Sequence, residues 1–214
     1  TADLMTILDR ETKQPVSHMA EAFLNEPGVP RLDFDLKCAA DKPPILRVQQ
    51  KVSRKRTGPM LPWRVPVCVR YGVKTSTSTT CFELQDMKAD VELSAPSCPT
   101  WFYGNAQESG YYTWSMSMPW LERLLDNLSV LTAVEKSALP ARLRRRAESG
   151  GLSLGRYVPA LVRLMSNDLA SVKSEALNNL VALAPVVGTT SKKREAFYQW
   201  LGTHLQPMWA SLQK

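Results

Sequence analysis

The sequence predicts a multi-domain chain in which an antiparallel, fibronectin-III-like β-sandwich is followed by an α-helical domain, with short helices in front of both. Two observations predict this order. From about residue 31, apolar and polar residues alternate with a period of two, in short runs separated by turn signals. After about residue 117, apolar residues recur at helical spacing instead. We therefore assign residues 1–30 to helices, 31–117 to the sandwich and 118–214 to the helical domain.

The first thirty residues predict two short helices. Leu4, Ile7 and Leu8 follow the i, i+3, i+4 spacing and form the apolar face of the first helix. The second helix is expected to end at residues 27–30, Pro-Gly-Val-Pro, because proline and glycine stop helical structure.

Seven short strands are expected in the sandwich. They fall at segments 32–36, 45–52, 65–70, 82–84, 91–93, 101–103 and 111–114. The polar residues 74–79 are expected to form the loop between the third and fourth strands. Short strands separated by turn signals are typical of an antiparallel sandwich.

The helical domain is expected to begin near Trp120, where leucines follow at helical spacing. Thr132 and Glu135 have the spacing of a capping box and predict the start of a second helix. Pro140 is expected to kink or split that helix, and Pro207 to interrupt the last one. Further helices are expected to start near residues 153, 169 and 190. Helices with short connections and no intervening strands are typical of solenoid-like helix hairpins.

All four cysteines lie in the predicted sandwich, and no Cys-x-x-Cys pair that would indicate a zinc knuckle is present. If the hairpin is symmetric about Lys74 and Thr75, Cys68 lies opposite Cys81, at a separation that a disulfide can bridge. This pairing leaves Cys38 with Cys98. Buried free thiols are the alternative. Disulfides would indicate an oxidising compartment, so a secreted or periplasmic location is favoured over a cytoplasmic one.

The residues that catalysis requires are missing from the sequence. His18 and His204 have no neighbours at ligand spacing, and H-E-x-x-H is absent. The glycine-rich segment 150–155 lacks the Gly-Lys-Ser/Thr ending of a phosphate loop and is expected to stop a helix. Four carboxylates lie on predicted strands at spacings typical of solvent-facing positions: Glu83, Asp86, Asp90 and Glu92. We therefore expect no catalytic residue, metal ligand or cofactor site in these 214 residues.

The net charge of +7 does not by itself indicate a nucleic-acid partner. Two basic runs stand out, at residues 54–56 and 142–146, but no stacking aromatics accompany them. We interpret both as solvated surface and expect no nucleic-acid binding. No apolar run approaches the roughly 20 residues that a membrane-spanning helix needs.

Five aromatic residues cluster near the end of the predicted sandwich: Trp101, Tyr103, Tyr111, Tyr112 and Trp114. They could line a carbohydrate or peptide groove. They could equally form the core and the seam between the modules, where amphipathic aromatics bury area and keep a polar group in reach of water. We favour the second interpretation, and we also assign Leu4, Ile7 and Leu8 to an interface.

Several segments resemble aminopeptidase N-like zinc metallopeptidases, in the order found in that family. Residues 23–30, FLNEPGVP, resemble the turn that leads from the catalytic domain into a β-sandwich. Gln49-Gln50 resembles a strand of that sandwich, and residues 63–67, WRVPV, resemble the next one. Residues 101–112 resemble the family's W-V-x-x-N-x-x-x-x-G-Y-Y segment. Trp120 then follows where the family's helical domain starts.

The resemblance covers about residues 1–150. It implies a zinc-binding catalytic domain upstream, which would be this chain's partner and would act on peptides. The chain would be the non-catalytic platform and the wall of an access chamber, and its exposed domain interfaces could self-associate. The helical start at Thr1 and the uncapped end at Lys214 also predict a segment of a longer protein. The four sandwich cysteines resemble those of secreted bacterial members.

Two departures from the family pattern leave the activity of such a parent open. Thr113 stands where the family has Arg or Lys, and Arg142 replaces an acidic residue of a helix. A second hypothesis is a protein- or glycan-binding sandwich with a helical extension, which the aromatic cluster supports.

Overall fold

A computed structural model describes residues 2–13, 16–25, 28–51 and 62–212. The chain divides into two compact units, Thr1–Asn127 and Leu128–Lys214, and each is described by itself. The division lies about ten residues beyond the end assigned to the sandwich from the sequence.

The first unit begins with two helices, α1 (Ala2–Thr12) and α2 (Val16–Asn25), which pack against each other. The Asp9 carboxylate of α1 accepts a hydrogen bond from the Ser17 backbone N–H at 2.8 Å and another from the Ser17 hydroxyl. Asp9 thereby occupies one of the N–H groups that the first turn of a helix leaves without an intrahelical partner.

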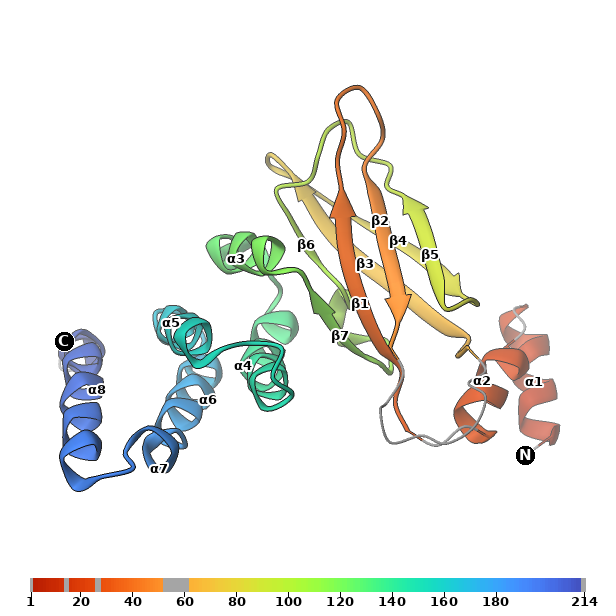
Figure 1. Ribbon diagram of the computed structural model, residues 1–214. Coiled ribbons are helices and arrows are strands. Elements are labelled where there is room, and N and C mark those ends of the chain that lie inside the picture. Colours follow the sequence, from red (N-terminus) through yellow and green to blue (C-terminus); the bar gives the residue numbers. More distant parts are fainter. Residues whose placement is uncertain (1, 14–15, 26–27, 52–61, 213–214) are drawn as a thin grey trace. The chain divides into compact units, whose positions relative to one another are not determined.

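In the described part of the chain, seven strands form two sheets that pack face to face (Figure 1). The strands are β1 (Arg31–Lys37), β2 (Ile45–Gln50), β3 (Val65–Val73), β4 (Ser76–Leu84), β5 (Lys88–Glu92), β6 (Trp101–Tyr103) and β7 (Thr113–Met116). One sheet has the order β5-β2-β1-β7 and the other the order β4-β3-β6. Leu32, Phe34, Val67 and Val69 are buried between them, as the alternation predicts.

One strand pair departs from the predicted antiparallel arrangement. β7 pairs with β1 in parallel, with Arg31 opposite Thr113 and Phe34 opposite Met116. The connection after β6 carries the chain from the three-stranded sheet to the four-stranded one, so β7 meets β1 running in the same direction. Two strands that are far apart in sequence become neighbours in this way, which a local pattern does not reveal.

The predicted loop at residues 74–79 is also wrong, because β4 already begins at Ser76. Only Lys74 and Thr75 connect β3 to β4, and Lys74 adopts a φ of 54° in the tight turn. Residues 76–79 are exposed on both faces of the strand. They therefore show no apolar alternation, and the sequence pattern misses this half of the strand.

The helix α3 (Met118–Asp126) belongs to the first unit. The Trp120 indole Nε1 donates to the Leu36 carbonyl at the end of β1, at 3.1 Å. The Trp120 ring also packs on Phe102 of β6 with centroids 5.4 Å apart, and the Arg123 guanidinium lies over the ring, 4.7 Å from its centroid. Trp120 therefore anchors α3 to both sheets.

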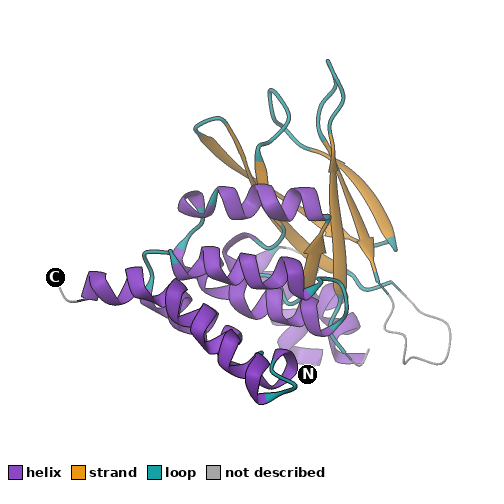
Figure 2. Ribbon diagram, turned by 60° about the vertical axis from the view of Figure 1, so that its left-hand side comes forward, coloured by secondary structure: helices purple, strands orange, loops and turns teal. Residues whose placement is uncertain are grey.

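The second unit is helical (Figure 2). Its helices are α4 (Ala133–Glu148), α5 (Leu154–Met165), α6 (Ala170–Val181), α7 (Ala184–Val187) and α8 (Ser191–Leu212). The predicted capping box at the start of α4 is present: the Glu135 N–H donates to the Thr132 hydroxyl oxygen, and the Thr132 N–H donates to the Glu135 carboxylate.

Of the kink or split expected at Pro140, the split is absent, because α4 runs without a break through this residue. A proline inside a helix costs about 3 kcal/mol. Leu139 and Leu143, on either side of Pro140, are each only 2% exposed, and burying two leucines offsets that cost. The expected interruption at Pro207 is likewise wrong, since α8 continues to Leu212.

Both predicted disulfides are present, Cys68–Cys81 and Cys38–Cys98. Cys68 lies directly opposite Cys81 in the β3–β4 register, with Cα atoms 4.1 Å apart. Cys38 follows β1, and Cys98 lies between β5 and β6, so this bridge connects the ends of the two sheets. Two disulfides are typical of a protein that folds in an oxidising compartment.

We expect removal of the Cys38–Cys98 bridge to destabilise the first unit more than removal of Cys68–Cys81. The bridges join residues 60 and 13 positions apart. In the chain-entropy model, loops of these lengths correspond to about 4 and about 3 kcal/mol. Urea unfolding of Cys38→Ala/Cys98→Ala and Cys68→Ala/Cys81→Ala measures the difference. Equal losses, or a larger loss for the short loop, would contradict this ranking.

Candidate functional site

The described residues contain no group of three histidine, cysteine, aspartate or glutamate side chains that could hold a metal ion. His18 lies in α2, and its side chain falls outside the described residues. His204 lies exposed on α8, with its Nδ1 2.9 Å from the Trp200 carbonyl and its ring 4.3 Å from the Trp200 ring. Within the described part of the chain, His204 makes no hydrogen bond or ion pair to a carboxylate.

The four strand carboxylates do not converge on a common point. Asp90 of β5 pairs with Arg47 of β2, with two oxygens 3.0 and 3.2 Å from guanidinium nitrogens. The hydrogen bond from Arg47 holds the pKa of Asp90 below its usual value. Glu83 lies 3.9 Å from Arg64. Pairs of this kind are typical of an exposed sheet face.

The glycine-rich segment 150–155 and the basic run at residues 142–146 make contacts that fit a structural role. Gly150 has a φ of 75° at the end of α4, and the Gly151 N–H and carbonyl both bond to Arg146. The segment therefore ends a helix, as expected. Of the basic runs, residues 54–56 lie outside the described residues. Arg144 of the other run pairs with Glu148 and Glu175.

Residues of the family-like segments meet around the side chain of Gln50. Its amide oxygen accepts from the Trp63 backbone N–H at 3.0 Å, and its Nε2 donates to the Trp63 carbonyl at 2.7 Å. The same Nε2 lies 3.1 Å from the carbonyl of Asp86, between β4 and β5. Gln50 is only 2% exposed, so this amide replaces water for three buried or partly buried backbone groups.

A second amide closes the loop between β6 and β7. Asn105 Nδ2 donates to the Gly110 carbonyl, and the Gly110 N–H donates to Asn105 Oδ1, both at 2.9 Å. The Tyr112 hydroxyl donates to the Gly104 carbonyl at 2.8 Å. A Cβ atom at Gly110 would overlap the Tyr112 ring, so only glycine fits there. Asn105, Gly110 and Tyr112 thus hold the loop between β6 and β7 in its folded shape.

The aromatic cluster separates into buried and exposed members. Trp101, Tyr103 and Tyr112 are at most 5% exposed, while Tyr111 is 66% exposed. Tyr103 packs edge-on against Trp114, with centroids 4.9 Å apart, between the two sheets. The buried rings cannot line a groove in this conformation.

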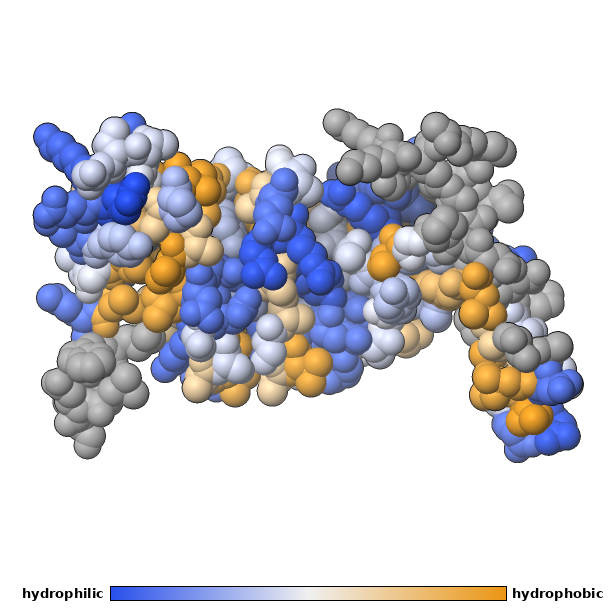
Figure 3. Space-filling view, turned by 90° about the horizontal axis from the view of Figure 1, so that it is seen from below, coloured by the Kyte–Doolittle hydropathy of each residue, from blue (hydrophilic) through white to orange (hydrophobic). Residues whose placement is uncertain are grey.

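The large exposed apolar side chains of the first unit lie on α1, on α2, just after α2 at Val29 and just before β7 at Tyr111. Figure 3 shows hydrophobic surface at the right of the view, over α1 and α2. Leu4 and Ile7 are 55% and 46% exposed, and Leu8 is half-buried. Phe23 of α2 contacts both Trp63 and the exposed Tyr111, with centroids 5.3 and 5.9 Å apart. We call Leu4, Ile7, Leu24, Val29 and Tyr111 the α1–α2 surface.

A hollow of about 540 Å³ lies beside the Cys38–Cys98 bridge, lined by residues 39–43 and 95–98. Asp41 and Lys42 are its charged members, and both are exposed. No buried polar side chain is among its lining residues, so it lacks the convergent polar groups of a specific ligand site.

The helical unit contains two perturbed titratable groups. Burial raises the pKa of Tyr157 to about 12, with Glu148 and Glu175 adding to the effect and Arg144 opposing it. The buried Lys136 donates to the Asp168 carboxylate at 3.2 Å, and this hydrogen bond lowers the pKa of Asp168. The Lys136–Asp168 hydrogen bond connects α4 to the segment between α5 and α6. Sequence reasoning missed it because partners 32 residues apart, such as Lys136 and Asp168, leave no local pattern.

No protein-family model matches the chain, and no curated protein matches it. Within the described residues, every helix is too short or too polar to cross a membrane.

We expect Gln50→Leu to lower the free energy of unfolding by about 2–4 kcal/mol, because it leaves buried backbone groups of Trp63 without partners. The neighbouring Gln49 is half-buried, and its side-chain oxygen accepts a hydrogen bond from Lys51 Nζ. Gln49→Leu is therefore the matched control and should change stability by less than about 0.5 kcal/mol. Urea unfolding followed by tryptophan fluorescence measures both. Equal effects of the two variants would contradict the role assigned to Gln50.

We expect the helical unit to lose stability between about pH 10 and pH 12. The folded-state pKa of Tyr157 lies above its ordinary value of 10.0, so unfolding releases its proton in this window and is favoured there. Below pH 10 the contribution is fully present. Tyr157→Phe should remove this loss, and Tyr198→Phe, at an exposed tyrosine, should not. Helix content by circular dichroism against pH, compared between the unchanged chain and the two variants, tests this.

Proposed function

We propose that the chain is the non-catalytic part of a zinc-dependent aminopeptidase of the aminopeptidase N-like kind. The sandwich would be the platform that spaces a catalytic domain from a helical domain. The helices would form part of the wall of the chamber through which peptides reach the zinc. Zinc and its ligands would belong to the catalytic domain of the parent protein.

The contacts made by the residues that resemble the family's motifs support this proposal. Gln50, Trp63, Asn105, Gly110 and Tyr112 were singled out by their resemblance to one family, and all five take part in backbone contacts that hold the sandwich. Residues kept for catalysis would instead converge on an open site. The segments that resemble the family therefore have the character of a scaffold.

The α1–α2 surface provides the contact that such a platform needs. Leu4 and Ile7 expose apolar side chains on one face of α1, and clustered exposed apolar residues mark interaction sites. We assign this surface to the adjoining catalytic domain. Seven strands in sheets of four and three fit a fibronectin-III-like sandwich. Successive helices of the second unit fit a solenoid-like array, and the two disulfides fit a secreted or periplasmic protein.

A binding module for proteins or glycans is the second candidate, and the exposure of Tyr111 favours it. Tyr111 stands at the edge of the α1–α2 surface beside Phe23. A glycan platform built from the whole aromatic cluster would need Trp101 and Tyr103, which are buried. Loss of binding to a glycan or protein array on Tyr111→Ala, with binding intact in Tyr198→Ala, would favour this candidate.

The reading frame upstream of this chain tests the proposal. We expect it to encode H-E-x-x-H, whose two histidines bind zinc, and a glutamate that serves as the third zinc ligand. The 214-residue chain itself should not hydrolyse aminoacyl-p-nitroanilides or hold stoichiometric zinc by elemental analysis. In the full-length protein, Leu4→Glu/Ile7→Glu should separate the unfolding of the catalytic domain from that of the sandwich in calorimetry. Val186→Glu, at an equally exposed valine of α7, is the control. A parent gene without a zinc motif would overturn the proposal.

A further inference from the structure

We infer that the outer edge of β4, beside which no strand of the described residues lies, is a pairing surface for a second copy of this chain. Pairing would join two three-stranded sheets into one of six strands. The inference does not depend on the proposed peptidase origin and involves a surface other than α1–α2. It rests on the properties of β4 as an edge strand, the direction of its backbone groups and the charges at its two ends.

The four sheet edges differ in how well they are protected. β5 has five residues, of which Lys88, Asp90 and Glu92 are charged. β7 has four residues, and β6 has three and packs against α3. β4 has nine residues without proline, and Glu83 is its only charged residue. Short length, charges and covering helices are the devices by which edges avoid pairing, and β4 has the fewest of them.

The outward-facing backbone groups of β4 follow from the register. The Thr100 N–H donates to the Gly72 carbonyl at 2.8 Å, so Gly72 points toward β6 and away from its partner Thr77 on β4. Ladder bonds alternate along antiparallel strands. Thr77, Thr79, Cys81 and Glu83 therefore direct their N–H and C=O groups to the free edge. The short Cα distance between Cys68 and Cys81 fits a pair without ladder bonds.

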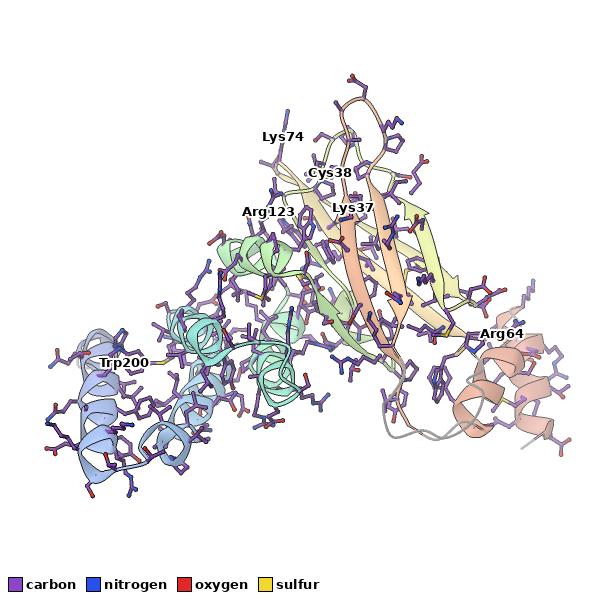
Figure 4. The ribbon with its side chains drawn as sticks, viewed as in Figure 1. Lys37, Cys38, Arg64, Lys74, Arg123 and Trp200 are labelled. Atoms are coloured by element: carbon purple, nitrogen blue, oxygen red, sulfur yellow. A yellow bond between two sulfur atoms is a disulfide. The ribbon has the colours of Figure 1, made fainter. Side chains whose placement is uncertain are left out.

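The charges along the hairpin make β4 complementary to itself. Lys74 lies at the tip of the β3–β4 hairpin and points away from the sandwich (Figure 4). Asp86 follows the other end of β4, and no ion pair of Lys74 or Asp86 occurs within the described residues. In an antiparallel pair of two copies centred on Thr80, Lys74 of each copy lies opposite Asp86 of the other.

Other registers are less favourable. A shift that centres the pair on Cys81 carries Lys74 past Leu84, the last residue of β4, and past Asp86. A shift that centres it on Thr79 places Lys74 opposite the apolar Leu84. The register centred on Thr80 also covers the half-buried Phe82 with Ser78 of the second copy. Opposite charges and aromatic or threonine pairs across strands are stabilising. The charges at the two ends of β4, together with the residues of the strand, thus select one register and a second copy as the occupant.

Sedimentation of the full chain with backbone variants tests the pairing. A single added strand pair buries less than the roughly 1,200 Å² of a stable interface, so the dimer should form at about 10 μM to 1 mM. Over that range the mass should rise from 24.0 kDa toward twice that value. Thr79→Pro removes an outward N–H without breaking a β3–β4 bond and should keep the chain monomeric. Thr79→Val keeps the N–H and should dimerise.

Charge exchange provides a test that does not depend on tolerance of proline. Lys74→Glu and Asp86→Lys should each weaken the dimer by about fivefold or more, because both copies then carry like charges opposite each other. The double variant Lys74→Glu/Asp86→Lys should restore it. Leu4→Ser/Ile7→Ser should leave the dimer unchanged. A chain that stays monomeric at about 1 mM, or a dimer indifferent to the charge exchanges, would overturn the inference.

Discussion

The sandwich depends on the buried amide of Gln50. A strand that packs in a two-sheet core must satisfy the backbone groups of the segments that cross between the sheets, because water cannot reach them. Gln50 does this for the Trp63 N–H and carbonyl and for the Asp86 carbonyl. It therefore fixes the entrance to β3 and the turn from β4 to β5 against the end of β2. Trp63 in turn contacts Phe23, so the position of α2 follows from the same amide.

Other buried polar side chains of the first unit also bond to backbone groups. Asn105 closes the loop that places β7 beside β1, and Trp120 ties α3 to the end of β1. In the helical unit, Lys136 reaches Asp168 in the same manner. A chain whose buried polar groups hold backbone and neighbouring helices has few left to act on a substrate. This use of its buried polar groups is the physical reason for proposing a platform role, with α1–α2 and the edge of β4 as its two outward-facing surfaces.

Patterns that arise within one element were read correctly from the sequence. The alternation of Leu32 and Phe34 placed β1, and the spacing of Thr132 and Glu135 placed the start of α4. The errors occurred where neighbours decide the outcome. Residues 76–79 form a strand because β3 offers them a complete ladder, although their own pattern is polar. The helix α4 continues through Pro140 because α5 and α6 bury its apolar face.

The sequence by itself determined the order of sandwich and helices, the strand alternation and the cysteine pairing. The pairing could be read because Cys68 and Cys81 belong to one hairpin, and its two-residue turn sets their register. Tertiary structure alone decided the parallel pairing of β7, the contacts of Gln50 and the free edge of β4. Each of these depends on segments distant in sequence that meet only after folding. A strand lies at the edge of a sheet when no further strand pairs with its outer side, and this cannot be predicted from the sequence of the strand itself.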